Sequence, residues 1–193
     1  MPDFSFFLTS ILLGVGLAMD AFSVSLANGL NEPCMKLRRM GGIAGIFAFF
    51  QFAMPLIGWL CVWGLSEAFE WFQPAIPWIA LILLGFIGGK MLWEGIKNKE
   101  CDEEKPAVGL WALAIQGIAT SIDALSVGFT ISEYNWWQAM LSCLIIGVET
   151  FFICFAGVAI GKKVGTALSG KAGILGGVIL IGIGLWIFIK SWF

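Results

Sequence analysis

The chain has 193 residues, of which 59% are hydrophobic and 12% charged, with a mean hydropathy of +0.91 and a formal net charge of −2. This composition excludes an ordinary soluble globular domain, and the acidic balance argues against a polybasic surface that binds nucleic acid. The sequence therefore predicts an all-α integral membrane protein.

Six apolar windows follow one another along the chain. Spanning about 30 Å of hydrocarbon takes about 20 mostly apolar residues, and the windows cover residues 5–28, 40–64, 76–97, 107–131, 136–160 and 172–191. The connections are too short for a soluble catalytic domain, so any chemistry must take place within or between helices. Only residues 98–106 carry much charge, and we expect them to be a cytoplasmic linker between residues 1–97 and 107–193.

The first two windows each carry a polar residue near the centre. Asp20 lies in the first window, with Ser23 three residues later and Asn28 at its end, and Gln51 lies in the second. A carboxylate at the centre of a bilayer costs on the order of 2.5–3.5 kcal/mol on insertion scales. Asp20 is therefore a candidate functional residue, and Gln51 is a second one at a similar depth.

The fourth window repeats the motif of the first. Ile122-Asp123-Ala124-Leu125-Ser126-Val127 matches Met19-Asp20-Ala21-Phe22-Ser23-Val24, and Thr120 precedes the second copy. If the chain repeats a unit of three helices, the second unit enters the membrane from the opposite side, because each unit has an odd number of spans. Two such inverted repeats would bring Asp20 and Asp123 near each other at mid-depth. Such repeats are typical of alternating-access transporters. The alternative, in which the aspartates only form helix–helix hydrogen bonds, does not explain so symmetric a duplication.

The fifth window adds a third acid, Glu149, and no base lies at this depth, so the pattern indicates a cation site. The chain has no histidine, and oxygen ligands suit magnesium, calcium and manganese. Metal binding to such acids is linked to proton release. The candidate metal ligands are Asp20, Asp123, Glu149, Gln51, Ser23, Ser126, Asn28 and Thr120.

The basic residues predict the orientation. They gather in the connections after the first, third and fifth windows, at Lys36, Arg38, Arg39, Lys97, Lys99, Lys105, Lys162, Lys163 and Lys171. Because cytoplasmic loops carry the excess of Lys and Arg, these connections should face the cytoplasm. Both termini are then expected outside.

Several segments resemble the bacterial manganese efflux pump family (MntP type), which is related to the lysine exporter superfamily. They are Ala18–Ser23, Pro55–Trp59, Ala119–Ala124 and Ile174–Gly184. The resemblance runs essentially from end to end. It implies a six-span exporter of the bacterial inner membrane that relieves manganese excess, with Asp20 and Asp123 handling the metal. Members of this family can carry an acid where this chain has Gln51, whereas here the third acid is Glu149.

The leading hypothesis is a secondary-active exporter that moves Mn²⁺ out of the cytoplasm by alternating access and exchanges metal for protons at its carboxylates. Mn²⁺ would be the substrate rather than a cofactor, and a homodimer is one possible assembly. One alternative is export of another divalent cation or of a cationic amino acid. A remote alternative is an intramembrane aspartyl protease, although neither aspartate lies in a Gly-x-Gly-Asp setting and a dyad has no role for a third acid.

Overall fold

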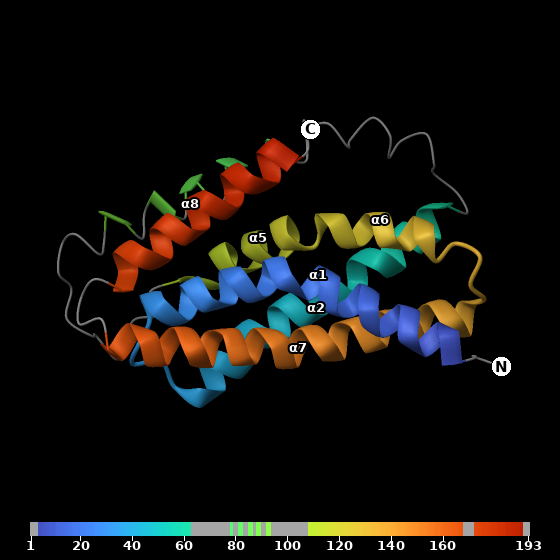
Figure 1. Ribbon diagram of the computed structural model, residues 1–193, viewed down its shortest axis with the longest axis horizontal. Helices are drawn as coiled ribbons and strands as arrows, with labels where there is room; N and C mark the ends of the chain where they lie inside the picture. Colours follow the sequence, from blue (N-terminus) through green and yellow to red (C-terminus); the bar gives the residue numbers. More distant parts are fainter. Residues whose placement is uncertain are drawn as a thin grey trace.

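The computed structural model describes residues 4–62, 108–167 and 172–190, together with isolated residues between 78 and 93. These residues form helices and no strands (Figure 1). The helices are α1 (Phe4–Asn31), α2 (Leu37–Val62), α5 (Leu110–Thr120), α6 (Ile122–Thr130), α7 (Trp136–Ala167) and α8 (Ala172–Lys190). In lipid, a helix satisfies its own backbone hydrogen bonds, which is why such apolar sequences fold this way.

Four segments are long and apolar enough to cross a membrane, and they match four of the predicted windows. They are Phe4–Asn31, Leu37–Cys61, Leu110–Thr130 and Trp136–Thr166. Helix α8 corresponds to the sixth window and contains a shorter apolar stretch, Ile174–Ile183. Most of the third window, 76–97, and the whole linker, 98–106, lie outside the described residues.

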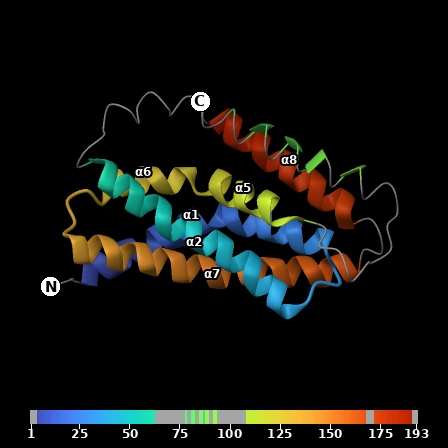
Figure 2. The ribbon, with the colours of Figure 1, turned by 180° about the vertical axis from the view of Figure 1, so that it is seen from behind.

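Helices α1 and α7 form the most extensive pair, α2 packs on α7 and α6, and α8 packs on α1 (Figures 1 and 2). Helices α1 and α7 end, and α2, α5 and α8 begin, at one end of the bundle. We call this the basic end, because it carries Lys36, Arg38, Arg39, Lys162 and Lys163.

At two helix crossings a glycine of one helix packs against the backbone of another, and each contact lies two residues after an aspartate. A Cβ atom at Gly157 of α7 would lie 2.9 Å from the carbonyl oxygen of Phe22 in α1, and one at Gly58 of α2 would meet the carbonyl oxygen of Leu125 in α6. Phe22 and Leu125 each follow an aspartate by two residues. Small residues let backbones approach where lipid supplies no hydrophobic drive, so each aspartate-bearing helix is held closely by a partner.

Candidate functional site

The predicted span 107–131 is two helices rather than one, because the chain breaks at Ser121. This residue has φ −111° and ψ 7°, and its amide donates to the carbonyl of Ile118 at 3.1 Å, a tighter turn than an α-helix makes. Thr120 contributes to the break, since its hydroxyl donates back to the carbonyls of Gln116 and Gly117. Back-bonding of this kind bends helices.

The break places Asp123 in the first turn of α6. Its Oδ1 accepts a hydrogen bond from the Ala124 amide at 2.9 Å, and its side chain is exposed at the bundle surface. A helix N-terminus carries partial positive charge and favours a carboxylate. Asp123 is thus held by its own half-helix at an accessible position.

Asp20 lies on the unbroken helix α1 and is half-buried. One turn away, the Ser23 hydroxyl donates to the Met19 carbonyl at 3.0 Å. Gln51 of α2 is fully buried, and its Nε2 donates to the Leu17 carbonyl of α1 at 2.8 Å. Gln51 therefore touches α1 one turn before Asp20.

The half-buried Glu149 of α7 reaches the same stretch of α1. Its Oε2 is buried, has no hydrogen-bond partner among the described residues, and occupies the space that a Cβ atom at Gly14 would need. Gln51 Oε1 is likewise buried without a described partner. The Glu149 carboxylate and the Gln51 amide, from two different helices, thus both reach residues 14–17 of α1.

Pro55 leaves the main-chain carbonyl oxygen of Gln51 available as a ligand. It lies inside α2 and has no amide hydrogen, so the carbonyl of Gln51, four residues earlier, lacks its usual helical donor. Gln51 can therefore offer both a side-chain and a main-chain oxygen.

The three acid-bearing helices meet in an apolar contact. Leu17, Ala124 and Ile146 pack in one cluster. Leu17 lies three residues before Asp20, Ala124 directly follows Asp123, and Ile146 lies three residues before Glu149. The carboxylates themselves do not share one coordination sphere in this conformation: within the described ranges, no group of three or more Asp, Glu or Cys side chains is placed to hold a metal ion. The structure brings the helices together at this level, and the acids lie around an apolar contact.

The other predicted ligands lie elsewhere. Asn28 contacts Gln116 of α5, its Nδ2 donating to Gln116 Oε1 at 2.7 Å, and Ser126 is exposed on α6. Gln116 is a polar residue that the sequence interpretation missed. The sequence does carry a signal, since Gln116 is an amide within an apolar window, one helical turn before Thr120, and the structure shows that it is fully buried.

Two cationic side chains tie the basic end together. Arg39 at the start of α2 forms an ion pair with Glu32, with Nε 2.9 and 3.0 Å from the carboxylate oxygens, and it also donates to the Val108 carbonyl ahead of α5. Lys162 near the end of α7 donates to the Met35 carbonyl at 2.7 Å. These contacts join the connection between α1 and α2, the start of α2, Val108 ahead of α5 and the end of α7.

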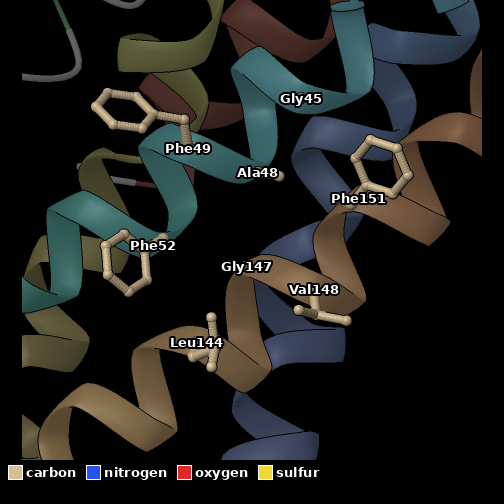
Figure 3. A pocket seen from close by; sticks show the side chains of 8 residues that line it. All are labelled: Gly45, Ala48, Phe49, Phe52, Leu144, Gly147, Val148 and Phe151. Atoms are coloured by element: carbon tan, nitrogen blue, oxygen red, sulfur yellow. The ribbon is translucent and has the colours of Figure 1, made fainter. Parts of the chain in front are cut away.

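A groove of about 280 Å³ lies between α2 and α7 (Figure 3). It is lined by Gly45, Ala48, Phe49, Phe52, Leu144, Gly147, Val148 and Phe151. None of these side chains carries an oxygen ligand, so the groove does not suit a metal ion. Its aromatic walls suit the hydrocarbon of a bilayer.

Known proteins resemble the chain along nearly its whole length. The family Mntp, described as "Putative manganese efflux pump", matches residues 34–188. A protein named "Putative manganese efflux pump MntP" from Ruminiclostridium cellulolyticum is 41% identical over 184 residues, covering 95% of each chain. Proteins of the same name from Clostridium botulinum and Gloeothece citriformis are 44% and 40% identical, covering 93% and 95% of this chain and 92% and 95% of their own. No solved structure matches.

Proposed function

Because the chain belongs to the Mntp family of manganese efflux pumps, we propose that it exports Mn²⁺ from the cytoplasm as a secondary-active transporter. Family membership agrees with the resemblance found in the sequence. The structural observation that best supports a cation site is the unpartnered Glu149 Oε2, which faces the same stretch of α1 that Gln51 contacts. A buried carboxylate oxygen without a donor is suited to a cation.

The site would comprise Asp20, Asp123 and Glu149, with Gln51 as a neutral ligand. Carboxylate and amide oxygens suit Mn²⁺, and three acids attract a divalent ion more strongly than a single charge. Ser23 and Ser126, each three residues after an aspartate, would supply hydroxyl oxygens from the same helices.

Ion binding would require the apolar contact of Leu17, Ala124 and Ile146 to open, so that the acids around it can close on the metal. Mn²⁺ would then displace the protons that the acids hold in its absence. Reprotonation from the outer side would release the metal, and the protonated site would return to the cytoplasmic side. This cycle exchanges one Mn²⁺ for protons by alternating access.

The inverted-repeat arrangement is part of the proposal. The matched glycine crossings, Gly157 against Phe22 and Gly58 against Leu125, support it, because each pairs an aspartate-bearing helix with the second helix of the other half. The basic end would face the cytoplasm and both termini the outside of the inner membrane.

Inside-out membrane vesicles test the proposal. In vesicles driven by a proton gradient, Asp20→Asn, Asp123→Asn and Glu149→Gln should each lower Mn²⁺ accumulation at least tenfold, because each removes a charge that holds the ion. Glu133→Gln, at an exposed position in the turn before α7, is the matched control and should accumulate Mn²⁺ like the parent. Parental accumulation by the Asp20→Asn and Asp123→Asn vesicles would refute the site. Competition by Co²⁺, Cd²⁺, Fe²⁺ or lysine would reveal a different substrate.

A further inference from the structure

Asn28 and Gln116 form a buried amide pair between α1 and α5, with exposed fractions of 1% and 0%. Their hydrogen bond uses only one polar group of each amide. Asn28 Oδ1 and Gln116 Nε2 are buried and have no hydrogen-bond partner within the described part of the chain. Since burying a polar group without a partner is unfavourable, two apolar side chains would hold these helices together at lower free energy.

The pair lies on the basic side of the aspartates, at similar distances along both helices. Asn28 follows Asp20 by eight residues of one continuous helix, about 12 Å at the helical rise, and Gln116 precedes Asp123 by seven residues, with the break at Ser121 between them. An ion whose ligands lie at about 2–2.5 Å cannot touch both levels at once. The amide pair is therefore a separate level, between the aspartates and the Arg39–Glu32 ion pair.

We propose that Asn28 and Gln116 form an inner cation station, which receives a partly dehydrated divalent ion from the cytoplasm and passes it to the carboxylates. This inference rests on the proposed function for its direction. When the hydrogen bond between the two amides opens, Asn28 Oδ1 and Gln116 Oε1 both become ligands for a cation. The hydroxyl oxygen of Thr120, which already contacts the Gln116 carbonyl, lies one turn further on.

Neutral ligands suit a station through which an ion passes. Amide oxygens replace part of the hydration shell of a divalent cation, but they attract it less than carboxylates do. The ion then meets increasing negative charge on its way to Asp20 and Asp123. The hydrogen bond between Asn28 and Gln116 also joins α1 to α5. A substitution there can therefore weaken helix packing as well as ion binding, and the two effects must be measured separately.

The first test measures KM and Vmax for Mn²⁺ in inside-out vesicles, normalised to folded protein. Gln116→Leu should raise KM about tenfold, the loss of about 1.4 kcal/mol of ion binding, with Vmax within twofold. The exchanged pair Asn28→Gln/Gln116→Asn keeps both amides and should stay within about threefold of the parental KM. Ser142→Ala, which removes a buried Ser10–Ser142 hydrogen bond far from the basic end, is the control and should leave KM unchanged. If Gln116→Leu lowers the amount of folded protein but leaves KM for Mn²⁺ unchanged, the residue serves only helix packing, and the proposed station is refuted.

The second test does not depend on export. Mn²⁺ binding to purified protein is followed by electron paramagnetic resonance in the background Asp20→Asn/Asp123→Asn/Glu149→Gln. Adding Gln116→Glu should tighten Mn²⁺ binding at least tenfold, whereas Ser142→Asp, a new buried acid at the other end, should not. Equal binding with and without Gln116→Glu would refute the station whether or not the parent exports manganese. Tight binding by Gln116→Glu beside a parent that moves no Mn²⁺ would refute the proposed function and leave the station standing.

Discussion

Gly14 determines where the carboxylate of Glu149 can lie. A Cβ atom at Gly14 would overlap Glu149 Oε2 and would approach the Ile146 Cα at 3.3 Å, whereas a Cβ at Gly16 would meet nothing within 4 Å. Two glycines two residues apart on α1 therefore differ completely in what surrounds them. The carboxylate is at the end of a flexible side chain, so it would move away, whereas the backbone of α7 at Ile146 would need to shift only slightly.

Gly14→Ala should consequently impair transport with little loss of stability. We expect Mn²⁺ export to fall about tenfold, because the displaced carboxylate can no longer face residues 14–17 of α1. Gly16→Ala is the matched control and should export Mn²⁺ at the parental rate. Rates are measured in inside-out vesicles, with thermal unfolding of the purified protein as the check on folding. Equal rates for the two variants would show that the position of Glu149 is unimportant.

The sequence predicted the acids but not their surroundings. Asp20, Asp123 and Glu149 were recognisable because charge is rare in apolar windows. The contact between Glu149 and Gly14 was not, since it joins residues far apart in the chain and depends on how α1 and α7 cross. Gln116 was not predicted although the amides Gln51 and Asn28 were, because nothing in the sequence shows that it faces Asn28 rather than lipid.

The break between α5 and α6 is the main feature at the scale of the secondary-structure elements. It creates a helix N-terminus within an apolar span, and Asp123 accepts a hydrogen bond there. Discontinuous helices supply ion sites in transporters because their ends expose backbone dipoles. The position of Asp123 therefore depends on residues 120 and 121 as well as on its own sequence motif.

Replacing Thr120 and Ser121 with alanine should straighten this span. Alanine favours continuous helix and removes the back-bonding hydroxyl of Thr120. The end of a helix stabilises a carboxylate by about 0.3–1 kcal/mol, so we expect an apparent affinity for Mn²⁺ several-fold weaker than that of the parent. Transport kinetics in vesicles provide the measurement. Thr130→Ala, at an exposed position on α6, is the control, and kinetics equal to this control would show that the break is not needed.

Within the described residues, the sequence predicted the extents of most helices but did not predict the break at Ser121. Length and hydropathy set the ends of α1 and α2 to within a few residues, because about 20 apolar residues are needed to cross the hydrocarbon. Helix α7 continues past the predicted end at 160 to Ala167, since a helix can extend beyond the membrane. The break at Ser121 has no hydropathy signal, and the back-bond of Thr120 does not by itself predict it, because Thr150 makes the same bond within the unbroken helix α7.

For the molecule as a whole, Arg39 and Lys162 link the segments at the basic end: Arg39 contacts Glu32 and Val108, and Lys162 contacts Met35. The side chains of Arg39 and Glu32 are 23% and 17% exposed, so their ion pair is largely shielded from solvent. In the orientation that we propose, opening the bundle toward the cytoplasm would require this pair to break. Residues of both halves of the chain take part, because Arg39 also binds the Val108 carbonyl.

Arg39→Gln should favour the conformation that is open to the cytoplasm. Loss of the ion pair is expected to shift the equilibrium by about 1 kcal/mol, roughly fivefold. The buried Cys154 of α7 can report the opening in a variant whose other cysteines are alanine. A thiol reagent applied from the cytoplasmic side should label Cys154 about fivefold faster in Arg39→Gln, while the exposed neighbour variant Arg38→Gln should match the parent. Unchanged labelling in Arg39→Gln would show that this pair does not hold the basic end closed.

The central claim is that oxygens from the two halves of the chain bind one metal ion, and crystals grown with Mn²⁺ test it most directly. Anomalous scattering at the manganese absorption edge locates the metal without reference to the protein. We predict a peak within about 2.5 Å of carboxylate oxygens of Asp20, Asp123 and Glu149, with Leu17 and Ile146 moved apart. Manganese found only at the surface, with these three carboxylates still separated, would contradict the account.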